Sequence, residues 1–294
     1  MLQNYEKKLK HRRFLIKKVY FCSRFLKQPI ARARYNRSAH RKIRDAGPII
    51  KSLANKKKHT SAIMSCILHI ESSTTVCSVA VSEDSHVIFH KEEYEGPNHA
   101  RVLAPMVDEA ASFADSHAIP LDAVAVSEGP GSYTGLRIGV SVAKGLCYGR
   151  NVPLINVPTL ETMCVWPLIY GPELPDDALL CPMIDARRME VYAALYDRSL
   201  KPVRPVQADI VDEATYAKWL RERPVWFFGN GMAKCKEVLA AHPGAHFIDD
   251  IHPLAQYMAP LAERRLIEGK VADTAYFEPF YLKEFQATTP RKLF

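Results

Sequence analysis

One order of predicted elements occurs twice along this chain, and this repetition limits the available folds more than any other feature. Each copy reads as strand, turn, strand, helix, strand, glycine turn and helix, and the copies begin at residues 66–70 and 179–184. A proline-rich link over residues 167–175 separates them. In the first copy a third strand, residues 86–90, follows a tight turn, so the first three strands should be antiparallel. Two copies of an α/β unit predict two similar lobes with a cleft between them, where ligands usually bind.

Positive charge is concentrated at the start of the chain. Residues 1–63 hold 19 Lys and Arg residues but only Glu6 and Asp45 as acids, a net charge of +17. Because the whole chain carries +8, residues 64–294 carry −9. Binding to nucleic acid depends on clustered Lys and Arg, so an acidic body argues against a broad nucleic-acid surface on residues 64–294.

Three explanations remain open for residues 1–63: a transit-like leader, a basic arm that holds RNA, or upstream sequence that is not part of the functional protein. The segment lacks the apolar core and the small-residue cleavage site of a secretory signal. Met64 immediately precedes the first predicted strand, which favours the third explanation and, after it, the RNA arm. Self-repulsion and sparse apolar patterning predict that little of this largely disordered segment is packed.

The cysteines indicate a reducing compartment, so we expect a cytoplasmic protein. Their number is odd and none forms a C-x-x-C pair, a pattern that favours neither a disulfide framework nor a zinc site. No apolar run reaches the ~18 residues of a membrane span. The seven cysteines lie at positions 22, 66, 77, 147, 164, 181 and 235.

A helix is predicted from Asn98 to about His117, and its apolar face is unusually wide. The apolar arc spans roughly 180°, more than the ~100° stripe that docks a helix on its own sheet. We therefore expect part of it to contact a second protein, although a helix wedged between the sheet and a neighbouring helix would show the same pattern. In the next helix, small residues at 135, 139 and 143 form a ridge that another helix could approach closely. The predicted partner interface consists of Val102, Leu103, Met106, Val107 and Ala110 with Leu136, Val140 and Ala143.

The glycine turn of the first copy, residues 127–135, is a candidate anion site. Free backbone N–H groups and the macrodipole at a helix N-terminus attract phosphate. The glycines are spaced one residue wider than in the dinucleotide fingerprint, so close packing explains them equally well. A hydroxyl-rich turn at residues 71–75 suits either a phosphate or an ordinary hairpin. The candidate cofactor-binding residues are Ser72, Ser73, Thr74, Gly129, Gly131, Ser132 and Arg137.

With the turn Glu71-Ser72-Ser73-Thr74-Thr75 and the sequence Gly-Pro-Gly-Ser-Tyr-Thr-Gly-Leu-Arg-Ile-Gly at residues 129–139 both in place, residues 64–294 resemble the TsaB (YeaZ) family. The resemblance implies a two-lobed actin/sugar-kinase/Hsp70-like fold, in which each lobe is a mixed five-stranded sheet with flanking helices. It also implies a partner of the transferase TsaD, with which, together with the ATPase TsaE, the family installs threonylcarbamoyl on the adenosine beside the anticodon of certain tRNAs. In the family, the first-lobe helices pack against TsaD. Glu71 departs from the Asp that many members carry, and the basic segment has no counterpart in the family.

TsaD is similar through the same strands, but the resemblance separates the two by their metal ligands. After the strand equivalent to residues 153–157, TsaD places two histidines four residues apart, where this chain has Thr159 and Met163. Neither side chain can replace an imidazole on a hard divalent ion, since a thioether is a soft ligand. We therefore expect no metal site and no catalytic residue.

The leading hypothesis is a non-catalytic scaffold that binds and activates TsaD. An ATP-binding phosphotransferase or ATPase of the same fold is the alternative, and a metalloprotease is the weakest option. The subunit is expected to need no cofactor of its own, with ATP or ADP only at the complex interface. It should reach tRNA through the complex, with a homodimer as the alternative state of the isolated chain. The predicted regions are the basic extension, residues 1–63, a first lobe, 64–165, and a second lobe, 166–294.

Overall fold

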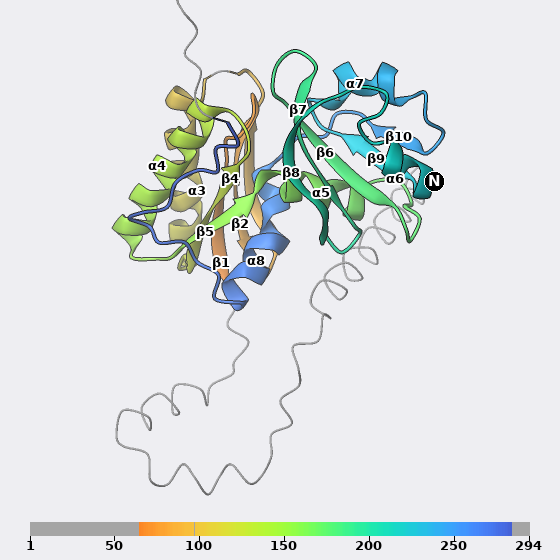
Figure 1. The fold of residues 1–294 in the computed structure, drawn as a ribbon. Coiled ribbons are helices and arrows are strands. Elements are labelled where there is room, and N and C mark those ends of the chain that lie inside the picture. The colour runs from red at the N-terminus through yellow and green to blue at the C-terminus, as the bar shows by residue number, and fades with distance from the viewer. Residues whose placement is uncertain (1–64, 97, 284–294) are drawn as a thin grey trace, which may run out of the picture.

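Two five-stranded sheets form the centres of two lobes (Figure 1), as the repeated element order predicts. The computed structural model describes residues 65–96 and 98–283, so the predictions for residues 1–63 lie outside the described part of the chain. Among the described helices, none combines the length and the hydropathy that crossing a membrane requires.

The first lobe is a mixed sheet covered by helices. Its elements are β1 (Cys66–Glu71), β2 (Cys77–Glu83), β3 (His86–Glu93), α3 (His99–Ser116), β4 (Ala123–Gly129), α4 (Tyr133–Arg150), β5 (Leu154–Pro158) and α5 (Thr159–Ile169). The strand order is β3-β2-β1-β4-β5, with antiparallel pairs among the first three strands and parallel pairs among the last three. Every residue of β1 is buried, which is why its sequence is a nearly continuous apolar run instead of an alternation.

The second lobe repeats this topology. Its elements are β6 (Leu179–Asp185), β7 (Glu190–Tyr196), β8 (Pro202–Ile210), α6 (Ala217–Glu222), β9 (Val225–Phe228), α7 (Met232–Leu239) and β10 (Ala245–Ile248). Read from β8 to β10, the sheet matches the first position for position, with the same antiparallel and parallel pairs. Two of these strands, β8 and β10, were not expected from the sequence. Both lie at the edges of the sheet, where a strand can contain proline, as β8 does, or be very short, as β10 is.

The end of the chain returns to the first lobe (Figure 1). The short helix η2 (Ala255–Met258) and helix α8 (Ala259–Ile267) lie beside its sheet, where the Ala255 N–H donates to the Ser78 hydroxyl at 2.9 Å. Farther on, the Ala272 N–H donates to the Leu154 carbonyl at 2.8 Å. From residue 255 the chain thus packs on the first lobe again, although the prediction assigns these residues to the second lobe, residues 166–294.

An apolar core joins the two lobes. Leu160 and Met163 of α5 are wholly buried in one cluster with Phe228 of the second sheet and Met258 of η2. Two further clusters lie under α3 and α4 on the first sheet and under α6 and α7 on the second. The helices that the duplicated pattern predicts thus cover the sheets, while α5 and the C-terminal helices fill the junction.

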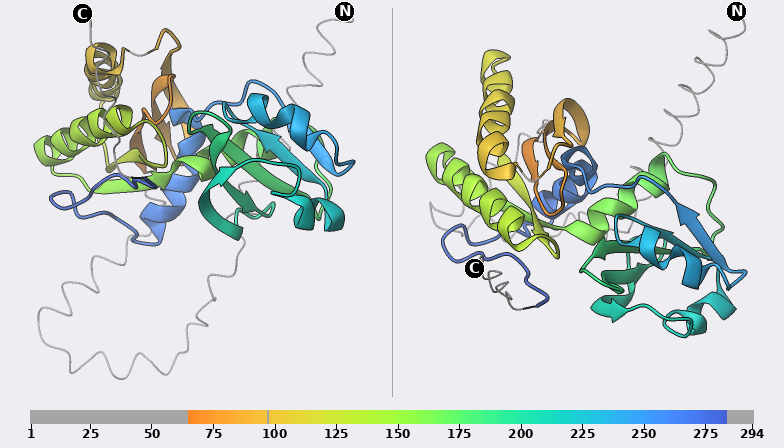
Figure 2. Two further views of the ribbon diagram at one scale, coloured as in Figure 1. Left: turned by 45° about the horizontal axis from the view of Figure 1, so that its top comes forward. Right: turned by 90° about the horizontal axis from the view of Figure 1, so that it is seen from above.

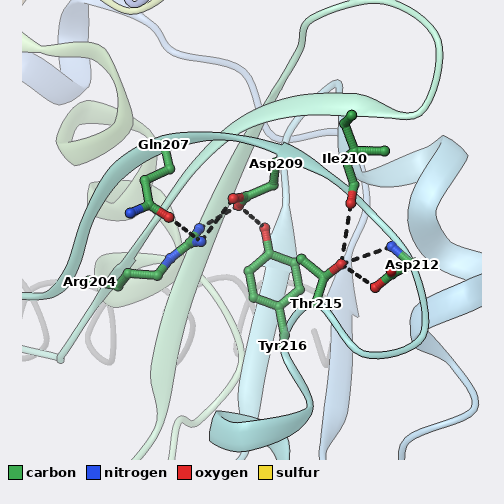
Figure 3. Close-up of polar contacts among 7 residues, drawn as sticks. All are labelled: Arg204, Gln207, Asp209, Ile210, Asp212, Thr215 and Tyr216. Carbon is green, nitrogen blue, oxygen red and sulfur yellow. Dashed lines mark hydrogen bonds and ion pairs between the residues drawn. The ribbon is translucent and has the colours of Figure 1, made fainter.

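A buried ion pair fixes the outer strand of the second sheet (Figure 3). Arg204 and Asp209, both in β8, are 8% and 9% exposed, and the guanidinium donates to the two carboxylate oxygens at 2.9 and 2.5 Å. The wholly buried Tyr216 donates its hydroxyl to the same carboxylate at 2.6 Å. These bonds connect β8 to Tyr216 at the start of α6, and removal of either charged side chain would leave the other buried without a counter-charge.

Candidate functional site

The two turns that carry the candidate cofactor-binding residues contact each other. The β1–β2 turn contributes Ser72 and Ser73, which are wholly buried. The β4–α4 turn contributes Ser132, whose N–H donates to the Ser73 carbonyl at 2.6 Å. The Ser72 hydroxyl donates to the Gly135 carbonyl at 2.9 Å. The structure therefore brings predicted residues of both turns together, but in direct contact with each other.

The glycines make this contact possible. A Cβ atom on Gly131 would overlap the carbonyl oxygen of Ser73, and one on Gly135 would overlap that of Ser72. Because a methyl group does not fit between the turns at these points, a phosphate group does not fit there either. Close packing, one of the two explanations drawn from the sequence, accounts for these glycines.

Two further candidates shape the backbone of the same turns. Gly129 has φ +112°, in the left-handed region that favours glycine, and the Phe280 carbonyl lies where its Cβ would be. Thr74 is 5% exposed, and its hydroxyl donates to the Val76 carbonyl at 3.4 Å. Both residues therefore contribute to local geometry.

Ser132 and Arg137 are the exposed members of the candidate set. Ser132 caps α4, since its hydroxyl accepts from the Gly135 N–H at 3.3 Å. The Arg137 guanidinium donates to the Tyr133 hydroxyl at 3.0 Å and lies 5.4 Å from the centroid of that ring. Arg137 is thus the one cationic group of the set, and it faces solvent.

Glu71, the departure from the family pattern, closes its own turn. It is wholly buried, and its Oε1 accepts a hydrogen bond from the Ser73 N–H at 2.6 Å. Burial raises the pKa of its carboxyl to about 7, because the ionised form is poorly solvated there. The carboxyl therefore stabilises the β1–β2 turn and faces no solvent.

The predicted partner interface lies mostly on the inner side of the helices. α3 and α4 run side by side over one face of the first sheet (Figure 2), and the two together explain why the apolar arc of α3 is so wide. Of the eight predicted residues only Val102 is half-buried, and the others pack against the sheet with no more than 5% of their surface exposed. The buried residues are Leu103, Met106, Val107, Ala110, Leu136, Val140 and Ala143. Side chains in these positions hold the helices on the sheet, so direct contact with a partner would fall to their exposed neighbours.

An outer ridge of α4, formed by Ser141, Gly145 and Gly149, faces solvent. A Cβ atom on either glycine would meet nothing within 4 Å. The half-buried side chains of Val142 and Leu146 flank this outer ridge. The sequence contains the same four-residue spacing at positions 135, 139 and 143, but that set is buried. Spacing alone could have found the outer ridge, but it could not tell which set the sheet covers.

The positions at which TsaD carries its histidines are buried here. Thr159 and Met163 are 0% exposed at the start of α5, and Met163 belongs to the core between the lobes. In the part of the chain that the structure describes, no group of three or more His, Cys, Asp or Glu side chains could hold a metal ion. That the functional protein lacks a metal stays a prediction from the sequence.

Known proteins similar to this chain fall into two related groups. The family model for TsaD, tRNA N6-adenosine threonylcarbamoyltransferase, matches residues 91–290. The tRNA threonylcarbamoyladenosine biosynthesis proteins TsaB of Escherichia coli strain K12 and Bacillus subtilis strain 168 are each 32% identical to this chain, over 224 and 228 residues respectively. Those alignments cover 74% and 75% of this chain and 94% and 95% of the relatives. The transferase of Salinibacter ruber is 37% identical over 140 residues, but only 42% of each chain is covered.

Solved structures share the two-lobed fold. YeaZ from Pseudomonas aeruginosa superimposes with a TM-score of 0.58 at 24% identity and covers 74% of this chain and 100% of its own. A second structure, described as an uncharacterized protein with similarity to peptidase YEAZ from the same organism, gives 0.60 at 25% identity and covers 75% and 100%. The two mixed five-stranded sheets are thus the actin/sugar-kinase/Hsp70-like fold that the resemblance implies. Since the match to TsaB proteins extends over nearly their whole length, the chain belongs to the TsaB (YeaZ) family.

Proposed function

We propose that this chain is a non-catalytic subunit that binds a TsaD-like transferase and activates it in the formation of N6-threonylcarbamoyladenosine beside the anticodon of tRNA. The pair works in the cytoplasm with a TsaE-like ATPase, and the complex holds the tRNA. Membership of the TsaB family supports the pathway, because the Escherichia coli and Bacillus subtilis members are named for it.

The outer ridge of α4 is the observation that carries the proposal. Small residues spaced four apart let two helices pack at the short end of the usual 8–10 Å range of interaxial distances. The apolar edges of Val142 and Leu146 beside the ridge would be covered by such a helix. The ion pair between Asp115 of α3 and Arg150 of α4 would form part of a polar rim. This pattern, an apolar strip with charge at its margin, suits a helical partner.

The contact between the β1–β2 turn and the glycine turn supports a subunit that needs no nucleotide of its own. Ser72 and Ser73 are wholly buried between the turns, so a nucleotide phosphate could reach their hydroxyls only if the turns separated. ATP or ADP in the complex would therefore lie at the interface with the partner.

Gly145→Leu tests the proposal directly. The added side chain projects into open space, so the monomer should keep its stability or gain up to about 1 kcal/mol, because glycine is a poor helix former. The affinity for the TsaD-like transferase of the same organism should fall at least about tenfold, since the leucine holds the two helices apart. Co-purification and calorimetry measure the loss, and Glu237→Leu, at an exposed position of α7, is the matched control that should leave binding intact.

Two outcomes would count against this function. If a folded Gly145→Leu variant bound the transferase as tightly as wild type, α4 would not form part of the interface. Turnover of ATP by the isolated wild-type chain would favour the phosphotransferase. Light scattering of the isolated chain, wild type against Gly145→Leu, shows whether the same ridge joins two copies when the transferase is absent.

A further inference from the structure

The tip of the β6–β7 hairpin holds two arginines in a left-handed conformation. Arg187 and Arg188 have φ of 72° and 50°, in the left-handed region where a side chain other than Gly, Asn or Asp is strained. Both are exposed, and neither side chain has a hydrogen-bond or ion-pair partner among the described residues. Two successive residues with positive φ also close the β2–β3 hairpin, at Asp84 and Ser85, so the turn itself is ordinary hairpin geometry and the two exposed charges at its tip are what distinguish it.

The surrounding hairpin is firmly held, and its acids are already paired. Asp185 forms an ion pair with Lys234, and its N–H donates to the Asn230 side chain at 3.0 Å. Glu190, at the other end of the turn, pairs with Lys283. The two arginines therefore keep their full positive charge beside carboxylates that are already neutralised.

Exposed aromatic side chains follow the same face of the molecule. Tyr276, Phe280 and Tyr281 are 84%, 43% and 36% exposed on the segment that ends the described chain. This segment runs along α4, since the Ala275 carbonyl accepts from the Lys144 ammonium at 3.0 Å and the Tyr281 ring lies 4.9 Å from that of Tyr133.

The segment connects α4 to the arginine hairpin. The Phe280 N–H donates to the Glu128 carbonyl at 2.7 Å, beside the start of α4, and Lys283 reaches Glu190 of the hairpin. Three residues of extended chain span about 10 Å, so Arg137 of α4 and the two hairpin arginines belong to one surface. The acids that face it are Asp273, which accepts from the Tyr276 N–H at 3.2 Å, Glu278, which lies near Tyr281, and the paired Asp185 and Glu190.

We propose that this basic–aromatic face, formed by Arg137, Arg187, Arg188, Tyr276, Phe280 and Tyr281, binds a single-stranded segment of the tRNA. Guanidinium groups pair with phosphates, and exposed rings stack on unpaired bases, which is the combination that single-stranded RNA requires. An acidic protein would need the arginines but would make no comparable use of the rings. The inference rests on the proposed function, and it adds that this chain contacts the RNA itself.

The position of the face fits that role. It lies along α4 beside the outer ridge, next to the surface proposed for the transferase. The net charge of −9 on residues 64–294 argued against a broad nucleic-acid surface. It does not exclude a narrow one, because the fold places Arg137 of the first lobe on one face with Arg187 and Arg188 of the second, which follow it by about 50 residues in the sequence.

The test uses the full chain in complex with its transferase and a fluorescent, unmodified tRNA transcript that carries the target adenosine. Arg187→Glu with Arg188→Glu should weaken binding about tenfold and reduce the slope of log affinity against log salt by about 1.4, the value for two phosphates on a single strand. Tyr276→Ala should weaken binding about fivefold through lost stacking. The matched control is Arg221→Glu with Arg223→Glu, the same charge change at the opposite end of the second sheet, which should leave affinity unchanged. Ultraviolet crosslinking should label peptides within residues 276–283.

Co-purification without RNA separates this proposal from the function on which it rests. A wild-type chain that fails to bind the transferase would refute the proposed function, and crosslinking of the chain alone would then decide the RNA contact. Hairpin variants that bind tRNA as tightly as the control pair, or crosslinks confined to residues 1–63 and the transferase, would overturn the inference. Loss of transferase binding with unchanged tRNA affinity would reassign the face to protein contact.

Discussion

In each lobe the turn after the first strand meets a glycine turn, and we call this meeting point the corner of the lobe. The corner of the first lobe is closed, because its residues are buried, and that of the second is open, because its residues are exposed. In the first lobe the turn after β1 meets the glycine turn after β4, and Glu71, Ser72 and Ser73 are wholly buried. In the second lobe the turn after β6 meets the glycine turn after β9, and both Asp185 and Arg187 are exposed. The topology is shared, so it cannot be the cause of this difference.

Side chains determine which corner closes. In the first, serines and glycines let two backbones approach until the Ser132 N–H reaches the Ser73 carbonyl at 2.6 Å. In the second, the Gly231 N–H donates to the Met183 carbonyl at 3.0 Å, and the Asn230 side chain also accepts from the Asp185 N–H at 3.0 Å, so a side chain forms part of the bridge. The corner of the first lobe is thus a packing contact between two turns, while that of the second presents charge to solvent.

Gly135→Ala should have the largest effect, because it forces the closed corner apart. The new Cβ would overlap the Ser72 carbonyl, a backbone atom that cannot move aside, and we expect a loss of roughly 4 kcal/mol in the free energy of unfolding. Gly231→Ala in the open corner should cost less, since its nearest contact is at 2.9 Å. Gly145→Ala is the control and should be neutral or stabilising. Urea unfolding measures all three, and equal losses at Gly135 and Gly231 would mean that the corners are equally tight.

Glu71→Gln should reveal a pH dependence that belongs to the closed corner. Burial raises the pKa of Glu71 to about 7 in the folded protein, above about 4.3 in the unfolded chain. Its contribution to stability is therefore fully present below about pH 4.3 and is lost as the pH rises through about 7, by roughly 4 kcal/mol in total. The Glu71→Gln variant has no carboxyl to ionise and lacks this loss. Its free energy of unfolding relative to wild type should therefore rise by the same amount as the pH increases from about 4 to about 8.

Urea unfolding of both proteins from about pH 4 to about pH 8 checks this change. Burial also lowers the pKa of His69, to about 3, but the histidine is present in both proteins and cancels in the difference. A constant difference between the two proteins over the whole range would show that the Glu71 carboxyl is solvated.

Arg187→Gly should stabilise the open corner by about 0.5–1 kcal/mol, because glycine adopts φ near 72° without strain. Arg223→Gly is the matched control, since Arg223 has φ −149° and glycine there adds only unfolded-state entropy. Thermal unfolding should therefore shift upward for the first variant and downward for the second. A lower melting temperature for Arg187→Gly would mean that the arginine is held by favourable contacts.

Lys234→Met should have the smallest effect, about 0.5 kcal/mol, because its partner Asp185 is 46% exposed and surface ion pairs contribute little. The ion-pair part of this difference should disappear at about 1 M salt, where the screening length is only about 3 Å. Lys234 also donates to the Glu190 carbonyl at 2.6 Å, so a loss that persists in high salt would show that the open corner depends on this hydrogen bond or on packing of the lysine stem.

Much of the first lobe could be predicted from the sequence. The helix expected from Asn98 to His117 is α3, His99–Ser116, and the strand predicted at residues 66–70 is β1. A helical apolar period identified the first and a short apolar run followed by a polar turn identified the second. The edge strand β8 could not be recognised, since two prolines interrupt its pattern. The return of the chain to the first lobe depends on contacts such as Ala255 with Ser78, which no local pattern contains.

The sequence identified the two turns of the candidate site but not how they lie relative to each other. The sequence picked the two turns that meet, but whether Ser73 and Gly131 enclose a phosphate or contact each other depends on distances that spacing does not fix. The sequence also predicted a wide apolar face on α3. The structure shows that Leu103 and Val107 of this face are buried against the first sheet and α4, so the width reflects two packing neighbours within the lobe. The sequence predicted a turn at Arg187 and Arg188, but it did not indicate that both residues have positive φ.

The rate of threonylcarbamoyl transfer to unmodified tRNA by the TsaD-like transferase is the most direct measure of the central claim that this chain is a helper subunit. Addition of the wild-type chain should raise the rate, Glu237→Leu should raise it equally, and Gly145→Leu, though folded, should not. A transferase that is equally fast without this chain, or transfer by this chain alone, would contradict the account.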